Sequence, residues 1–168
     1  LAVRHPERIR TLTSLVSHMG EPGFPPPNPD AVAFLTRPAP SDREGYISYS
    51  MELSRVLGGR LPLDEAYASS TAARAYDRAF HPDGVARQYA AFLATGSLKE
   101  ELRRLEVPTL IIHGSDDPLI SLDAAAAMAE VTPRAELLVV EGMGHAVNEC
   151  PEAWPPILEA FTRHARKG

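Results

Sequence analysis

Two short motifs bring together the residue types of an acid–base pair. His145 lies in EGMGHAV, residues 141–147, directly after the apolar run AELLVV. Asp116 and Asp117 lie in HGSDDP, residues 113–118, directly after the apolar run TLII. A carboxylate that accepts a hydrogen bond from an imidazole fixes the tautomer of the ring and stabilises its protonated form during nucleophilic catalysis. The two motifs therefore predict a general base, His145, that is oriented by an aspartate.

Each motif also has a purely structural interpretation. An Asp-Asp-Pro sequence forms a good turn, and glycines are expected in any tight loop that follows a strand. A single histidine in a loop is often only hydrogen-bonded structure. The catalytic interpretation depends on the order and the position of the two motifs rather than on either one alone.

Three apolar runs are expected to form the strands that position the motifs. They cover residues 11–16, 108–112 and 136–140, and each is short, rich in β-branched residues and without polar alternation. This pattern is typical of parallel strands that are buried on both faces. Ligands gather at the carboxyl ends of such strands, so the loops with Asp117 and His145 should be neighbours.

Helical patterns alternate with the last two strands. SLDAAAAMAEV offers Ser121 as an N-cap before strong helix formers, and PEAWPPILEAFTRHARKG begins with prolines and ends in a basic turn, which suits the two ends of a helix. From Val107 onward the order strand, helix, strand, helix predicts an α/β sheet with right-handed crossovers. The opening LAVRHPERIRTLTSLV indicates the end of a helix that runs into the first strand.

The middle of the chain, residues 20–97, is expected to be a helical insertion between two strands. A proline-rich entry, GEPGFPPPNP, leads into three helix-like segments. Nine of the eleven aromatic residues lie in this insertion: Phe24, Phe34, Tyr46, Tyr49, Tyr67, Tyr76, Phe80, Tyr89 and Phe92. They could line an apolar binding cavity, or they could simply pack small helices against one another.

Composition excludes several classes of partner. The 168 residues are 44% hydrophobic and 23% charged, with a formal net charge of −5, which fits one globular domain and argues against nucleic acid or an anionic membrane as partner. No apolar run is long enough to span a membrane. Cys150 is the only cysteine, so no intrachain disulfide forms and a reducing, cytoplasmic location is favoured.

The remaining histidines lack a comparable pairing argument. His113 is expected to be a hydrogen-bonded structural residue, and no metal-ligand spacing surrounds it or the others, so no metal site is predicted. Residues near the strand ends are candidates for ligand contact: Ser17, His18, Met19, Leu119, Ile120 and Met143.

The quoted segments LAVRHPERIRTLTSLV, LEVPTLIIHGSDDPLIS and AELLVVEGMGHAVNECPEAWPPILEAF resemble the C-terminal half of an α/β-hydrolase-fold protein. They are most similar to esterase-like members such as aclacinomycin methylesterase and the enol-lactonases. The resemblance implies an α/β fold with about three strands of the parallel hydrolase sheet and an inserted helical cap. It divides the chain into the end of a helix and a strand of the hydrolase core (1–19), the helical cap insertion (20–97) and the C-terminal part of the core with acid and histidine (98–168).

The G-x-x-D pattern of the family selects Asp117 as the acid and leaves Asp116 as a turn residue, and the histidine of GMGH is His145. The family order is serine, acid, histidine, and here the acid precedes the histidine by 145 − 117 = 28 positions. No G-x-S-x-G occurs in the sequence, so the resemblance implies a nucleophile a short distance before Leu1. The chain alone is therefore predicted to be inactive, as a fragment of a larger enzyme.

Three functions are open at this stage. The first is a serine hydrolase without a cofactor, acting on a small carboxylic ester or lactone. The second is a relative with other chemistry: a dehalogenase, an epoxide hydrolase or a cofactor-free haloperoxidase. The third is a non-catalytic, ligand-binding member. The strand at residues 11–16 should also present an open apolar edge, which predicts self-association unless another polypeptide covers it.

Overall fold

Three parallel strands form the centre of the computed structural model, which describes residues 1–167. The strands are β1 (Leu12–Leu15), β2 (Thr109–Gly114) and β3 (Ala135–Val140), in the spatial order β1-β2-β3. The register pairs Leu12 with Thr109 and Thr109 with Ala135. The three predicted strands and the α/β class are thus confirmed, with bounds that differ by one or two residues.

The central strand β2 is buried along its whole length, as its continuous apolar run predicts. Successive side chains of a strand point to opposite faces. Leu110 and Ile112 pack with residues of the C-terminal helix α7 (Trp154–Ala165), which follows the short 3₁₀ helix η2 (Pro151–Ala153). Ile111 packs on the other face, against helix α6 (Leu122–Val131). The Ser121 side chain caps α6 by accepting a hydrogen bond from the Ala124 N–H, as predicted.

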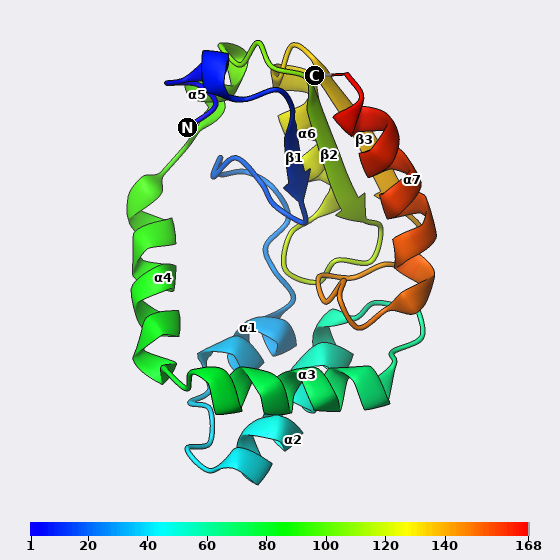
Figure 1. Ribbon diagram of the computed structural model, residues 1–168. Coiled ribbons are helices and arrows are strands. Elements are labelled where there is room, and N and C mark those ends of the chain that lie inside the picture. Colours follow the sequence, from blue (N-terminus) through cyan, green and yellow to red (C-terminus); the bar gives the residue numbers. More distant parts are fainter. Residues whose placement is uncertain (168) are drawn as a thin grey trace.

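The segment between β1 and β2 is helical. It contains α1 (Pro29–Thr36), α2 (Arg43–Leu57), α3 (Glu65–Arg78), α4 (Pro82–Thr95) and α5 (Lys99–Arg103). Figure 1 shows α1, α2 and α3 gathered beyond the carboxyl ends of the strands, where the two motifs lie. The helical segment therefore overhangs the edge of the sheet at which a site is expected.

Aromatic side chains in this segment pack mainly on one another. Phe34 lies 5.0 Å from Tyr49 between ring centroids, and Tyr76 lies 5.5 Å from Tyr46 and 5.0 Å from Phe80. None of the nine aromatic residues of the insertion lines either of the two pockets described below. These aromatic clusters therefore pack α1, α2 and the α3 region against one another.

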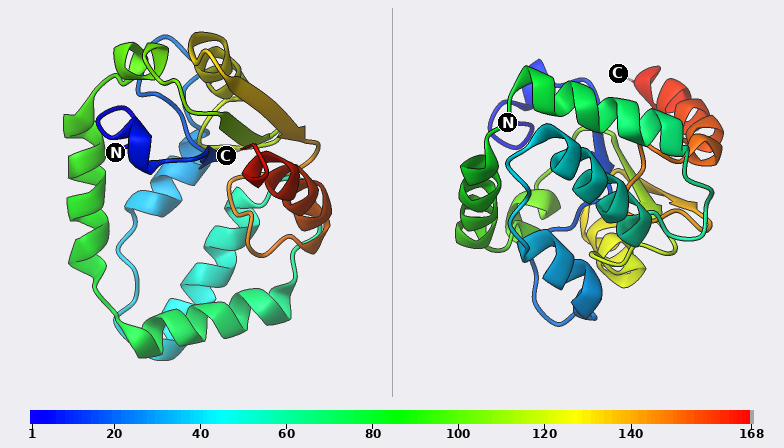
Figure 2. Two further views of the ribbon diagram at one scale, coloured as in Figure 1. Left: turned by 45° about the horizontal axis from the view of Figure 1, so that its top comes forward. Right: turned by 90° about the horizontal axis from the view of Figure 1, so that it is seen from below.

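None of the residues of helix α4 is buried. Its apolar side chains Val85, Tyr89 and Leu93 are 63%, 57% and 62% exposed. Figures 1 and 2 show α4 at the side of the molecule, away from α7. The first residues of the chain also differ from expectation: only the 3₁₀ turn η1 (Pro6–Arg8) precedes β1, because Pro6 lacks an N–H and restricts the residue before it.

Strand β1 is an edge strand in the described part of the chain. The Leu12 N–H donates to the carbonyl oxygen of Pro108, just before β2, and the Val16 N–H donates to that of Ile112 in β2. Since alternate residues of a strand direct their backbone groups to opposite sides, Thr13 and Leu15 direct theirs away from β2. Helices α6 and α7 pack on β2 and β3, which leaves the free edge of β1 available to another strand.

We expect the 168-residue chain to self-associate through this edge, because unpaired strand groups pair with further chains. Sedimentation analysis over a range of concentrations should show reversible oligomers. Thr13→Lys should shift the distribution toward monomer, since a lysine on an edge strand disfavours pairing, whereas Thr95→Lys on the exposed end of α4 should not. A wild-type chain that stays monomeric at every concentration would contradict the expectation.

The described residues contain no helix that is both long and apolar enough to cross a membrane.

Candidate active site

Asp117 and His145 meet at the carboxyl end of the sheet. Asp117 lies in the loop after β2 and His145 in the loop after β3, and these two strands are adjacent and parallel. Nδ1 of His145 lies 2.8 Å from Oδ2 of Asp117. Because a carboxylate accepts, Nδ1 is the donating nitrogen of the ring. Nε2 is then the nitrogen that is left to exchange a proton with a ligand.

The carboxylate of Asp117 is fully buried and fixed from several sides. Its Oδ1 accepts the backbone N–H groups of Leu119 at 2.8 Å and Ile120 at 3.0 Å. Burial opposes ionisation of Asp117, but the hydrogen bond and charge of His145, together with the two backbone donors, outweigh it and lower the pKa of Asp117 below its usual value. The carboxylate is therefore held ionised beside the imidazole.

A second imidazole lies against the same carboxylate. His113 is fully buried at the end of β2, and its Nε2 donates to the Ile120 carbonyl oxygen at 2.9 Å. The same nitrogen lies 3.5 Å from Oδ2 of Asp117. This contact fixes the loop that carries Asp117, which agrees with the prediction that His113 is a hydrogen-bonded structural residue.

The backbone of the histidine loop, residues 141–147, is held by the end of helix α2. The carbonyl oxygen of Leu57 accepts from the N–H groups of His145 at 2.7 Å and Ala146 at 3.1 Å, and that of Gly58 accepts from Gly144 at 3.0 Å. Two positions in this loop require glycine, each for a different physical reason. Gly142 has a φ of +75°, which favours glycine, whereas Gly144 is needed because another backbone approaches it closely.

We expect Gly144→Ala to lower the free energy of unfolding by at least ~1 kcal/mol. The added Cβ would lie 2.1 Å from the Leu57 carbonyl oxygen, so one of the two backbones must move and the hydrogen bonds from the His145 and Ala146 N–H groups to this oxygen must lengthen. Chemical denaturation measures the loss. Gly84→Ala is the matched control, because a Cβ there meets nothing closer than 3.8 Å and alanine favours a helix. Equal stability of the Gly144→Ala chain and the wild type would refute this close approach.

His145 is 26% exposed and lines a pocket of about 300 Å³. Its other lining residues are mostly apolar and come from the end of β1, from α2 and from the chain after β3: Leu15, Val16, Leu53, Ser54, Leu57, Ala146, Val147, Asn148 and Glu149. Val16 has a φ of +43°, a strained conformation for a β-branched residue. Sequence reasoning did not find this wall, since its members lie on three distant segments.

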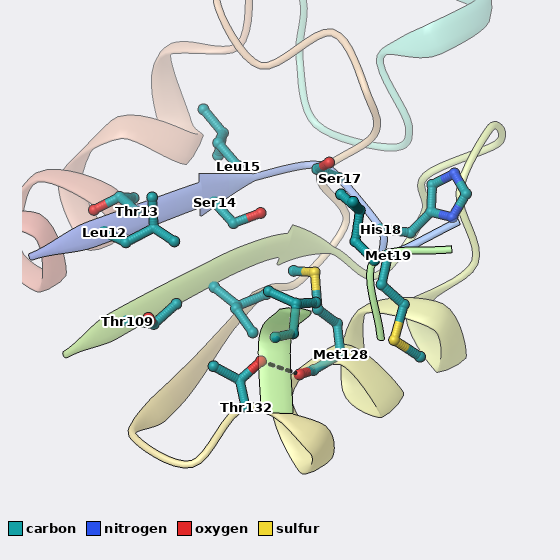
Figure 3. Close-up of a pocket in the computed structure, with 13 residues that line it drawn as sticks. Leu12, Thr13, Ser14, Leu15, Ser17, His18, Met19, Thr109, Met128 and Thr132 are labelled. Atoms are coloured by element: carbon teal, nitrogen blue, oxygen red, sulfur yellow. Dashed lines mark hydrogen bonds between the residues drawn. The ribbon is translucent and has the colours of Figure 1, made fainter. Parts of the chain in front are cut away.

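The residues that were predicted for ligand contact lie elsewhere. His18 and Met19 line a second pocket of about 370 Å³ beside β1, together with Met128 and Thr132 of the α6 region (Figure 3). Burial, and then the nearby His113, lower the pKa of His18. Leu119 and Ile120 line neither pocket and serve the carboxylate of Asp117 through their N–H groups.

Two further predicted residues take other places. Met143 lines neither pocket; it is 0% exposed and packs in the hydrophobic core. Asp116, which was predicted to be a turn residue, forms an ion pair with Arg60 from the helical segment. Arg60 is a site neighbour that sequence reasoning missed, because 56 positions separate it from Asp116.

Comparison with known families identifies the architecture. The family model described as alpha/beta hydrolase fold matches residues 1–149. The chain belongs to the α/β-hydrolase fold family. In this α/β-hydrolase chain, Asp117 follows β2 and His145 follows β3, so the acid precedes the histidine as it does in the family.

Several relatives match the α/β-hydrolase chain. The 2-hydroxymuconate semialdehyde hydrolase of Pseudomonas putida is 27% identical over 98% of this chain and 58% of its own length. The non-heme chloroperoxidase CPO-A1 of Kitasatospora aureofaciens is 40% identical over 31% of this chain and 19% of its own length. The solved structure of the 2-hydroxy-6-oxo-6-phenylhexa-2,4-dienoate hydrolase of Rhodococcus sp. strain RHA1 superposes with a TM-score of 0.68, at 22% identity, over 99% of this chain and 58% of that one.

The α/β-hydrolase chain thus spans about 58% of the length of the relatives that match it from end to end. Its relatives include hydrolases and chloroperoxidases, so the comparisons support the family and not one specificity within it. The narrower resemblance to esterase-like members stays a prediction.

Proposed function

We propose that these residues form the acid–base half of a serine hydrolase that cleaves a small carboxylic ester or a lactone. The observation that carries the proposal is the 2.8 Å hydrogen bond from Nδ1 of His145 to the fully buried carboxylate of Asp117. In the reaction, Nε2 of His145 takes the proton of the nucleophile hydroxyl and then gives it to the leaving alkoxide, while Asp117 stabilises the imidazolium between these steps.

The proposed nucleophile lies on polypeptide outside these residues, since the sequence contains no G-x-S-x-G. The free edge of β1 supports this part of the proposal. The added strand would be parallel to β1, precede it in the chain and be joined to it by a helix. In a right-handed crossover this helix lies on the face of the sheet that carries α6, because α6 connects β2 to β3 in the same direction across the sheet. The pocket of Figure 3 lies on that face, between β1 and α6. One strand and one helix would therefore cover both open surfaces.

The pocket beside His145 supports a substrate with an apolar group. Leu15, Leu53 and Leu57 line it next to the imidazole. Binding sites of small molecules combine such apolar walls with a few polar groups that orient the ligand. We propose that the apolar part of the ester or lactone binds here, with its carbonyl carbon toward Nε2 of His145.

A second candidate is hydrolysis of a carbon–carbon bond, by analogy with the 2-hydroxymuconate semialdehyde hydrolase that matches 98% of the chain. The same acid–histidine pair serves either substrate, so the pair does not choose between them. Cofactor-free haloperoxidase chemistry is kept as a further alternative because chloroperoxidases also match.

The test uses the full gene product, by which we mean the polypeptide translated from the whole reading frame that contains these residues. A fluorophosphonate probe is expected to label one serine outside residues 1–168, and labelling should abolish hydrolysis of p-nitrophenyl esters and simple lactones. A full gene product that no probe labels would overturn the serine mechanism. A higher kcat/KM for 2-hydroxymuconate semialdehyde than for every ester would select the second candidate, and halogenating activity without hydrolysis would select the third.

A further inference from the structure

The linker between α2 and α3, which we define as residues 58–64, runs beside the histidine loop as a short antiparallel partner. Gly59 forms an isolated antiparallel bridge with Met143. The N–H groups of Arg60 and Leu61 donate to the Gly142 carbonyl oxygen at 2.8 and 3.1 Å. A second contact follows at the end of the linker, where Asp64 donates to the Glu149 carbonyl oxygen at 2.8 Å. The helical segment is therefore a direct backbone partner of the loop that carries His145.

The contact is as close as two backbones allow. Gly59 has a φ of +76°, and a Cβ on it would lie 2.5 Å from the Gly142 carbonyl oxygen and 2.6 Å from the Gly144 nitrogen. Only glycine fits both the conformation and the space. Because nothing lies between the two segments, a displacement of the linker must displace the histidine loop.

The side chain of Arg60 extends this contact to the loop with the acid. Its guanidinium group forms an ion pair with Asp116, with Nη2 at 3.1 Å from Oδ1, and a second ion pair with Glu141, with Nη2 at 2.7 Å from Oε1. Asp116 directly precedes Asp117, and Glu141 begins the histidine loop. The hydrogen bond from Arg60, and then that from Ser115, keep the pKa of Asp116 below its usual value, so the pair stays charged. One cation thus joins three segments.

Ser115 provides a neutral connection between the same two loops. Its hydroxyl donates to Oδ1 of Asp116 at 2.8 Å and accepts from the Gly142 N–H at 2.8 Å. Asp116 is therefore held by Arg60 on one side and by Ser115 on the other, and both partners also reach the histidine loop.

We propose that Arg60 is a positioning residue for the Asp117–His145 pair, through which the helical segment sets the orientation of the His145 imidazole. The proposal rests on the proposed function for the role of that pair. The side chain of Arg60 is 69% exposed, and exposed ion pairs contribute little to global stability. Its effect is accordingly a local one: it fixes the spacing of the two loops, on which a hydrogen bond between them depends.

The test follows the tautomer of His145 in the 168-residue chain by ¹⁵N NMR of the imidazole nitrogens. In the wild type the neutral ring should carry its proton on Nδ1, and that proton should exchange slowly with water. R60M is expected to give a mixture of the two tautomers and at least roughly tenfold faster exchange of the Nδ1 proton, with R60K intermediate. R43M removes another bidentate ion pair of an exposed arginine, with Asp77 inside the helical segment, and it should leave both signals of His145 unchanged.

The outcomes separate this inference from the function on which it rests. An R60M chain with the wild-type tautomer and exchange rate would overturn the role of Arg60 while leaving the Asp117–His145 pair intact. A wild-type chain without the Nδ1–H tautomer would overturn the pair itself. If R60M does not fold, D116N provides the same test from the other side, because it removes the charge that Arg60 binds.

Discussion

Replacement of His145 by alanine is expected to lower the kcat of the full gene product by roughly 10³-fold or more. In the proposed mechanism the variant loses the group that takes the proton from the nucleophile, whereas the apolar wall of the pocket stays in place. KM should therefore change little, and steady-state kinetics on an ester that the wild type hydrolyses would show the split between the two constants.

The matched control for this variant is His5→Ala. His5 is exposed, and its side chain lies away from both strand-end motifs, next to Glu7. The control should keep wild-type kcat. Near-normal turnover by the His145→Ala enzyme would disprove the assignment of His145 as the general base.

Replacement of Asp117 by asparagine should lower kcat by at least roughly 10²-fold, somewhat less than the loss of His145. An amide has no charge with which to stabilise the imidazolium, and its NH₂ group can favour the wrong tautomer of the ring. Asp83→Asn, at an exposed carboxylate in the first turn of α4, is the control. Equal kcat values for Asp117→Asn and Asp83→Asn would show that the buried carboxylate has no part in catalysis.

Asp117→Asn should also change the pH dependence of stability, which can be measured without an activity assay. The pKa of Asp117 in the folded chain lies below its usual value, so the ionised carboxylate stabilises the fold above about pH 4. That contribution is lost as the pH falls through the lower, folded-state pKa. Thermal unfolding of the 168-residue chain at several pH values should show a smaller drop toward acid pH for Asp117→Asn than for the wild type.

The core of the fold follows from local patterns in the sequence. The continuous apolar run of β2 predicts a strand that is buried on both faces, and the rule for strand ends predicts that Asp117 and His145 are neighbours. Both statements depend only on residues within one strand–helix–strand unit. Such short-range regularities are what a single sequence carries most clearly.

Contacts between distant segments were not predictable in this way. Leu57 binds the histidine loop across 145 − 57 = 88 positions, and neither partner has a side chain that reveals the contact. The pair Gly58-Gly59 after an amphipathic helix was the one available signal. Helix α1 was not predicted, because it begins within the proline-rich entry. Asn28 followed by Pro29 is nevertheless a regular helix start, and the Asn28 side chain accepts a hydrogen bond from the Asp30 N–H.

The exposure of α4 has a consequence for motion. A helix of 14 residues that buries none of them has little tertiary packing to stabilise it, and isolated helices of that length are marginal in water. Local unfolding of α4 therefore costs far less free energy than unfolding of the sheet. Its backbone amides should exchange with deuterium early, and limited proteolysis should cut there first, whereas β2 should be protected until the whole chain unfolds.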